Sequence, residues 1–297
     1  MVDIVILGTV ALDNIKTPFG KVENALGGSA TYAAYSASFF AKSGVVSIVG
    51  KDFPQEHLDF LKKKIDLEGL KREGKTFRWE GYYEFDMNEA KTLNTCLNSL
   101  ETFKPEIPEK YKDAKYLFLA NLDPSLQLEV LEQIKAEFVV LDTMNLWINH
   151  KKEELLKVIK KVDVLLLNDG EARQLFNTVN LVKAANMALK LGPKHVIIKK
   201  GEHGALFFTD STHFNAPGYP LENIKDPTGC GDSFGGGFIG YLAKTKNLSE
   251  PNIRKAIIYG SAIASYNAED FSLNRLKKIT IEDIEKRYGE FEEIRRF

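Results

Sequence analysis

The sequence predicts an α/β fold in which a mostly parallel sheet is flanked by helices. From about residue 114, short apolar runs alternate with amphipathic stretches, the rhythm of strands and helices in turn. Such alternation builds a parallel sheet through right-handed crossovers. The chain has 297 residues, 44% hydrophobic and 27% charged, enough to close a sizeable core. No Pro-, Gly- or Ser-rich linker and no repeat divides it, so we expect one domain over residues 1–297.

The expected elements follow one another along the chain. Two N-terminal strands enclose a helix over 29–41, whose small residues recur at helical spacing. In the second half each apolar run is followed by a stretch with helical periodicity. We expect strands at 4–9, 45–50, 116–120, 138–142, 162–167, 196–200 and 205–208, and helices at 124–136, 151–161 and 169–191.

One segment departs from this rhythm. Residues 76–85 alternate polar and apolar side chains with no helix before the next polar stretch, which is typical of a half-exposed antiparallel strand. We expect it to pair with residues around 11–26. The segments 11–26 and 75–102 would then form a small β-sheet lid over the edge of the main sheet.

Composition argues against several classes of protein. Forty Lys and Arg oppose 41 Asp and Glu, a net charge of -1 that gives no drive toward nucleic acid. Mean hydropathy is -0.22, charges interrupt the apolar stretches, and the first residues lack a basic leader, so we expect no membrane span and no export signal. Two cysteines, Cys96 and Cys230, exclude a disulfide framework and favour the cytoplasm.

A phosphate-loop pattern occurs early in the chain. Residues 69–76 consist of a glycine, four residues and Gly-Lys-Thr, the pattern of nucleotide-binding loops. That loop must follow a buried strand and open a helix. Here residues 61–68 have a helical pattern and Thr76 begins the alternating segment, so we interpret the match as accidental.

The strongest signal lies between Asp226 and Asp232. An Asp followed by Pro227 can simply start a helix. The glycines indicate an anion-binding site in addition to a helix start. Gly229 and Gly231 leave backbone N–H groups uncovered at a helix N-terminus, where these donors and the helix dipole favour a phosphate-like anion. Asp232 would stand beside that anion and could accept a proton from a hydroxyl group. The pattern indicates phosphoryl transfer.

The helix after this motif contains Gly235, Gly236, Gly237 and Gly240. Each interior glycine costs about 1 kcal/mol relative to alanine, so something must offset that cost. We expect close packing of the helix backbone against the sheet or another helix.

These motifs resemble the ribokinase-like sugar and nucleoside kinases, the PfkB family. The stretch 226–232 is similar to the family signature, and the glycine pair, the alternating segment and the C-terminal half follow in the family's order. The resemblance implies a Rossmann-like sheet with a β lid. It also implies Asp232 as base, with the amides of Gly229, Cys230 and Gly231 holding the developing charge. Cys230 stands where the family usually has Ala; a nucleophilic cysteine is the competing idea, although no histidine is near in sequence.

The same resemblance places a nucleotide. Asn168 and Glu171 match a family element that lies near the phosphates and helps to place Mg²⁺ through water, whereas the residues alone favour a helix cap. Lys200, Gly201 and Thr228 would lie along ATP, although Lys200 and Gly201 also fit an ordinary hairpin turn.

Asp226 together with Thr228 is a candidate for holding a monovalent cation such as K⁺. This assignment rests on the resemblance alone.

For the acceptor, the resemblance points to the N-terminal region. Seven residues are candidate contacts: Asp13, Asn14, Gly27, Gly28, Ser29, Tyr32 and Asn145. Asp142 is expected at the border of the site. Tyr32 replaces an asparagine that holds sugar hydroxyls in many members, and a tyrosine could stack on a flat ligand face.

We therefore expect ATP-dependent phosphorylation of a hydroxyl group on a small sugar or polyol. A nucleoside kinase is the alternative, and a sensor without turnover is a further one. The chain would be a monomer or a homodimer formed through the lid.

Overall fold

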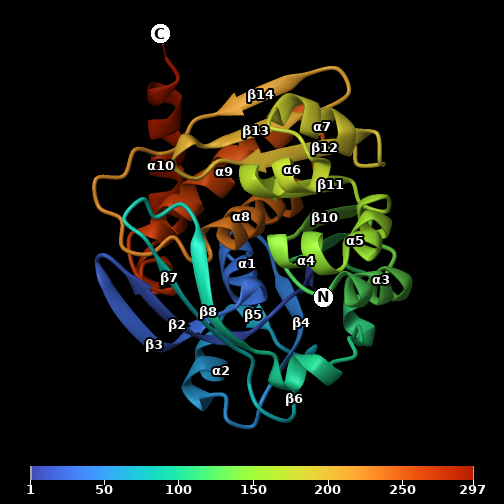
Figure 1. Ribbon diagram of the computed structural model, residues 1–297, viewed down its shortest axis with the longest axis vertical. Helices are drawn as coiled ribbons and strands as arrows, with labels where there is room; N and C mark the ends of the chain where they lie inside the picture. Colours follow the sequence, from blue (N-terminus) through green and yellow to red (C-terminus); the bar gives the residue numbers. More distant parts are fainter. Residues whose placement is uncertain (1, 297) are drawn as a thin grey trace.

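The structure is a computed structural model that describes residues 2–296. Figure 1 shows a central sheet sandwiched between helices, with a second sheet at one end. The strands are β1 (Ile4–Leu7), β2 (Ala11–Thr17), β3 (Gly20–Gly27), β4 (Ser43–Val49), β5 (Ile65–Asp66), β6 (Leu70–Arg72), β7 (Arg78–Tyr83), β8 (Ala90–Cys96), β9 (Tyr116–Leu119), β10 (Phe138–Asp142), β11 (Val164–Asn168), β12 (His195–Lys199), β13 (Ala205–Phe208) and β14 (His213–Ala216). The helices are α1 (Ser29–Ala37), α2 (Gln55–Leu61), α3 (Pro124–Gln133), α4 (Asn145–His150), α5 (Lys152–Ile159), α6 (Asp169–Phe176), α7 (Leu181–Leu189), α8 (Cys230–Thr245), α9 (Glu250–Ala268) and α10 (Ile281–Ile294).

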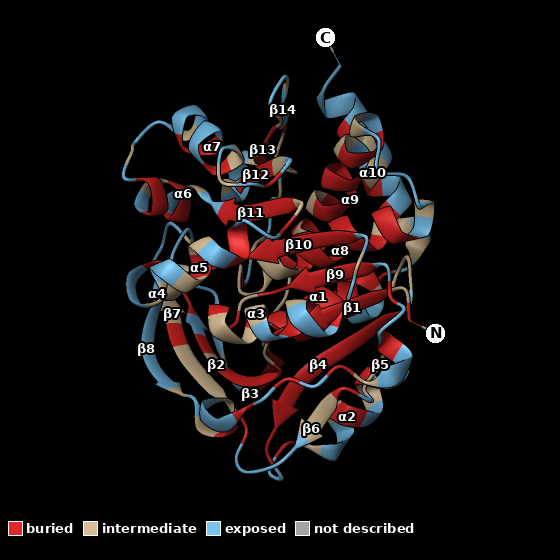
Figure 2. Ribbon diagram, turned by 90° about the vertical axis from the view of Figure 1, so that its right-hand side faces the viewer, coloured by how far each residue is buried: buried red, intermediate tan, exposed pale blue. Residues whose placement is uncertain are grey.

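The main sheet confirms the predicted α/β class. Its strand order is β14-β13-β12-β11-β10-β9-β1-β4-β5, with β6 also paired to β4. The pairs from β12 to β5 are parallel, and the hairpin of β13 and β14 adds two antiparallel strands at one edge. The central strands are buried throughout (Figure 2), which explains their continuous apolar sequences.

Two hydrophobic cores lie on the two faces of this sheet. Ile4 and Ile6 of β1 belong to the core that α1, α8 and α9 cover, whereas Val5 and Leu7 belong to the core under α3, α5 and α7. This split follows from the alternation of side chains along a strand. Both cores leave the carboxyl ends of the strands free to carry polar residues.

Two helical expectations need correction. The helix expected over 169–191 is two helices, α6 and α7, because Asn177 takes a left-handed conformation with φ 47° and ends α6. The stretch 61–68 is not one helix: α2 ends at Leu61, and Ile65 and Asp66 form an edge strand.

The phosphate-loop pattern does not form such a loop. Part of it is strand β6, and Thr76 donates its hydroxyl to Asp52 and is itself fully buried.

The expected small sheet is present, with strand order β3-β2-β7-β8. Strands β2 and β3 form a hairpin, as do β7 and β8, and the two hairpins join through the parallel pair of β2 and β7. In Figure 1 this sheet lies at the end of the main sheet that β4 and β5 form, and the β7–β8 hairpin extends toward α4 and α6. Within residues 2–296, no helix is long and apolar enough to cross a membrane.

Candidate active site

Polar residues gather where three neighbouring strands of the main sheet end. Asp142 closes β10, Asn168 closes β11 and Lys199 closes β12, and these strands are adjacent in the sheet. The N-terminus of α8 faces them. The carboxyl ends of parallel strands are where open α/β sheets bind ligands, so this edge is the candidate site.

Residues Gly229–Gly231, which we call the anion loop, start α8. Gly229 has a φ of 77° and is the N-cap, with no side chain satisfying the first amides of the helix. The N–H of Cys230 donates to the carbonyl of Pro227 at 3.1 Å, so this amide, expected to hold the phosphoryl charge, is already engaged. The amides of Gly229 and Gly231 and the positive end of the helix dipole therefore form the anion-binding surface.

The thiol of Cys230 is directed toward α9. Its sulfur lies 3.5 Å from the carbonyl oxygen of Ala264 and 3.5 Å from Nδ2 of Asn267. Burial raises the pKa of this thiol to about 12, so it stays protonated near neutral pH. A nucleophilic role for Cys230 is disfavoured.

Asp232 lies in the first turn of α8, beside the anion loop. Burial, and then the charge of Asp142, raise the pKa of its carboxyl, whereas the charge of Lys199 lowers it, and the net pKa is about 7. A carboxylate with a pKa near the working pH is suited to accept a proton during a reaction.

A buried ion pair underlies the anion loop. Nζ of Lys199 lies 2.5 Å from Oδ2 of Asp142, and these side chains are only 16% and 4% exposed. The ammonium also lies against Gly231, since a methyl group added there would be 3.1 Å from Nζ. The charges of Glu171 and Asp232 act on it as well.

Asn168 and Glu171 form a reciprocal cap at the start of α6. Oδ1 of Asn168 accepts the N–H of Glu171, and Oε2 of Glu171 accepts the N–H of Asn168, both at 2.7 Å. Burial raises the pKa of Glu171 to about 8, while Lys199 lowers it. The cap expected from the residues alone is therefore formed, and it holds Glu171 close to the ion pair.

Lys200 and Gly201 lie just beyond β12, in the turn toward β13. The N–H of Lys200 donates to the carbonyl of Gly204, which closes the hairpin turn. Gly201 faces the tip of the small sheet, with Oδ1 of Asn88 3.7 Å from the position of an added methyl group. Thus the β7–β8 hairpin reaches the turn that follows β12.

A second polar centre surrounds Asp226, which is fully buried. Its Oδ1 accepts the N–H of Thr228 at 2.9 Å, while Oδ2 has no hydrogen-bond partner among the described residues. The side-chain oxygen of Asn267 is likewise unpartnered, and its amide nitrogen donates to the carbonyl of Thr228 at 2.8 Å. Burial raises the pKa of Asp226 to about 6. Buried oxygens without donors are fitting neighbours for a cation.

On the acceptor side, Asp13 is held against the glycine pair. A methyl group added to Gly27 would overlap Oδ2 of Asp13, at 1.8 Å, and Gly28 has a φ of 94° at the start of α1. Burial, and then the charge of Asp226, raise the pKa of Asp13, whereas a hydrogen bond from the amide of Gly28 lowers it. The net pKa is about 8. Because this pKa lies above neutral pH, Asp13 can hold its proton and form hydrogen bonds with an uncharged ligand.

Three other acceptor candidates are placed differently from expectation. Asn14 accepts the N–H of Asn24 and projects from the opposite face of β2, because successive side chains alternate along a strand. The hydroxyl of Ser29 is bonded within the fold, to Thr9 and the carbonyl of Asn121. Asn145 is exposed at the first residue of α4.

Tyr32 also departs from expectation. Its ring packs beneath Gly229, where an added methyl group would lie 2.5 Å from it, and the residue is 1% exposed. The ring is therefore covered and not open for stacking. Its hydroxyl has no partner within residues 2–296.

The small sheet contributes side chains to the same region. The hydroxyl of Thr17 donates to the carbonyl of Lys225 at 2.8 Å, and Oγ1 of Thr228 lies 3.2 Å from the hydroxyl of Tyr83. The small sheet is therefore bonded directly to the segment that leads into the anion loop.

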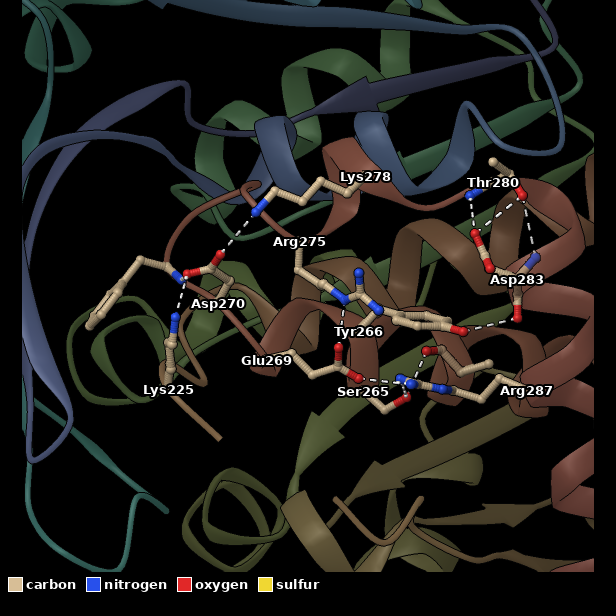
Figure 3. A network of polar contacts seen from close by, with 12 residues as sticks. Lys225, Ser265, Tyr266, Glu269, Asp270, Arg275, Lys278, Thr280, Asp283 and Arg287 are labelled. Carbon is tan, nitrogen blue, oxygen red and sulfur yellow. Dashed lines mark hydrogen bonds and ion pairs between the residues drawn. The ribbon is translucent and has the colours of Figure 1, made fainter. Parts of the chain in front are cut away.

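That segment is also anchored from the other side. The N–H of Lys225 donates to the carbonyl of Ala268, and its ammonium pairs with Asp270. Figure 3 shows the neighbouring network, in which Glu269 binds Arg275 and the buried Arg287. These contacts tie the end of α9 to α10 and hold the entry to the anion loop in place.

Comparison with known proteins identifies the family. The model described as pfkB family carbohydrate kinase matches residues 4–278, which include both sheets and the anion loop. The chain belongs to the pfkB family. It is a kinase, a transferase with a hydroxyl group as acceptor.

Relatives of this pfkB kinase include a protein named cytidine kinase from Thermococcus kodakarensis, 32% identical over 257 residues, 84% of this chain and 92% of that one. The solved nucleoside kinase of Methanocaldococcus jannaschii superposes with a TM-score of 0.78 at 20% identity, over 97% of this chain and 98% of that one. A putative ribokinase II from E. coli, solved with ATP and Mg²⁺, has a TM-score of 0.80 at 17% identity, over 98% and 100%. Both structures confirm the ribokinase-like fold.

The sequence of this pfkB kinase does not by itself predict the pairing of Lys199 with Asp142. It places Asp142 only at the border of the site and favours Lys200 along the nucleotide. A usable signal existed, because Lys199 and Asp142 are each the polar residue that ends an apolar strand.

Proposed function

We propose that this kinase transfers the γ-phosphoryl group of ATP to a hydroxyl group of a nucleoside. The relative named cytidine kinase supports a nucleoside over the free sugar or polyol expected from the sequence. One observation carries the proposal: the small sheet presents a fixed, partly exposed indole ring on the same face as Asp13. A sugar has hydroxyl groups for a carboxyl group, but only a nucleoside also has a flat base for an indole.

That indole belongs to Trp79. Trp79 is the register partner of Asp13 in the pair of β2 and β7, so both side chains project from one face of the small sheet. The ring lies over Gly81, where an added methyl group would be 2.2 Å from it, and its Nε1–H donates to Oγ1 of Thr92 at 3.1 Å. The ring orientation is thereby set before a ligand binds. Stacking of a base on such a ring contributes about 1–3 kcal/mol.

The nucleotide donor fits the anion loop. The uncovered amides at the start of α8 and the ammonium of Lys199 match the phosphates of ATP, and the E. coli structure holds ATP with Mg²⁺ in a related fold. Glu171 would hold Mg²⁺ through water, with Asn168, Lys200, Gly201 and Thr228 along the nucleotide. Mg²⁺ would supply charge neutralisation at the phosphates.

In this mechanism the side chains of the chain have separate tasks. Asp13 accepts and donates hydrogen bonds to orient the acceptor hydroxyls. Asp232 takes the proton of the attacking hydroxyl group as its oxygen bonds to phosphorus. The anion loop stabilises the charge on the phosphoryl oxygens. The small sheet, joined to the anion loop through Thr228, excludes water.

A panel of acceptors tests the proposal. We expect cytidine, uridine, adenosine or inosine to stimulate ADP formation from Mg-ATP at least tenfold more, in kcat/KM, than ribose, fructose or a polyol. In Trp79→Ala, KM for the best nucleoside should rise about tenfold, as loss of stacking predicts, while Trp79→Phe keeps most of the affinity. Equal or better turnover of a free sugar, with no effect of Trp79→Ala, would favour the sugar kinase.

We also propose a monovalent cation beside Asp226 and Asn267, whose side-chain oxygens Oδ2 and Oδ1 are both unpartnered within the described residues. Exchanging K⁺ for tetramethylammonium should lower kcat about tenfold, because a bound cation adds positive charge next to the anion loop. In Asp226→Asn this dependence should vanish along with most activity. An enzyme equally active in both salts would contradict the cation.

A further inference from the structure

We infer that Lys199 is a catalytic residue that contacts the phosphoryl group in transit, and that Asp142 holds its ammonium in place between turnovers. This inference rests on the proposed phosphoryl transfer from ATP. It adds a side-chain cation to the backbone amides of the anion loop.

The position of Nζ is the first argument. It lies against Gly231 of the anion loop and 2.5 Å from Asp142. An anion bound at the amides of Gly229 and Gly231 would therefore be a close neighbour of the ammonium. Lys199 ends β12, a strand of the rigid sheet, so only the outer part of its side chain needs to move.

The charge balance is the second argument. The charges of three carboxyl groups, Asp142, Glu171 and Asp232, act on this one ammonium, and all three are buried or partly buried. An isolated buried ion pair is weak support for a fold, since apolar side chains of similar volume often stabilise as well or better. If Lys199 only neutralised Asp142, the pair would add no stability to the fold beyond that of two packed apolar side chains. A cation that also binds phosphate has a role at the anion loop that an apolar pair could not fill.

In the proposed step, the bond between the γ-phosphorus and the β,γ-bridging oxygen breaks and ADP keeps the electron pair. The oxygen of the acceptor hydroxyl bonds to phosphorus, and its proton passes to Asp232. Lys199 donates hydrogen bonds to the phosphoryl oxygens, keeps its own protons and is unchanged at the end. After the product leaves, Nζ again donates its hydrogen bond to Asp142, which holds the ammonium in place for the next turnover.

The test uses Lys199→Met and the double variant Lys199→Met/Asp142→Asn in the full chain. The double variant removes both charges of the pair, so neither charge is left buried without a partner. If the pair had only a structural role, the double variant would regain both stability and activity. We expect its melting temperature to return to within a few degrees of the wild type, while kcat stays at least 100-fold lower, the usual loss for one group that stabilises transferred charge.

Calorimetry gives a readout that does not need turnover. Binding of ATP and of ADP is measured on the wild type and the double variant. We expect the ratio of ATP to ADP affinity to fall about tenfold in the double variant. A structural role would change both affinities equally.

The outcomes separate this inference from the proposed function. A double variant that regains kcat, or that keeps the wild-type ratio of affinities, overturns the role of Lys199. A wild type without acceptor-dependent turnover overturns the proposed function, yet a fallen ratio would still support the contact between Lys199 and phosphate. If the double variant does not fold, Lys199→Arg replaces it: the proposal expects a shifted ratio of affinities, and an unchanged ratio with full kcat contradicts it.

Discussion

Asp232→Asn is expected to lower kcat about 10³-fold, because the amide can no longer accept the proton of the attacking hydroxyl group. Asn has nearly the same shape as Asp, so the anion loop should persist and the Kd for ATP should stay within a few-fold of the wild type. ADP formation with the best acceptor and calorimetry with ATP measure the two quantities. Asp59→Asn, which changes a carboxylate on the surface helix α2, is the matched control and should keep full kcat.

The pH dependence of the wild type checks the same role. Asp232 accepts a proton only when ionised, and burial holds its pKa at about 7. Hence kcat/KM for the acceptor should rise with pH from about 6 to 8 and then level off. A rise that persists unchanged in Asp232→Asn, or a variant with near-normal kcat, would show that another group takes the proton.

Gly236→Ala is expected to destabilise the fold by about 3 kcal/mol, the upper part of the range for overpacking. Gly236 lies in α8 where it crosses α1, and an added methyl group would be 2.1 Å from the carbonyl oxygen of Ala33, a backbone atom that cannot turn aside. Because α1 begins at the glycine pair and α8 at the anion loop, separating them should also lower kcat. Urea denaturation measures the change in the free energy of unfolding.

Gly289→Ala is the matched control, with the opposite sign. Gly289 lies inside α10, and no atom is within 4 Å of the position of an added methyl group. Alanine there should stabilise the protein by about 0.5–1 kcal/mol through helix propensity alone. If Gly236→Ala were as stable as Gly289→Ala, the close approach of α1 and α8 would not be the reason for the glycines of α8.

Much of the fold was predictable because the dominant signals are local. The apolar run 116–120 and the alternating segment 76–85 each reveal one strand by their own pattern, and β9 and β7 lie there. The capping box of Asn168 with Glu171 is also local, three residues apart. By contrast, the left-handed Asn177 that divides the helix expected over 169–191 is a single backbone conformation with no periodicity to mark it.

The parts of the candidate site that escaped prediction depend on long-range placement. Asp142 and Lys199 are 57 positions apart, and only the order β10-β11-β12 brings their side chains together. Tyr32 is covered because the left-handed Gly229 lays the anion loop over its ring, a contact between the start of α1 and the start of α8. Asn14 could have been assigned to the outer face, since it follows Asp13 directly on a strand.

Phosphorus NMR of a single reaction tests the central claim most directly. Wild-type protein is mixed with Mg-ATP and the best nucleoside of the panel, and the products are followed over time. Transfer to the nucleoside predicts a new phosphomonoester signal that grows in step with ADP, with little inorganic phosphate, and neither signal in Asp232→Asn. ADP that appears with an equal amount of inorganic phosphate, and no ester, would contradict the account.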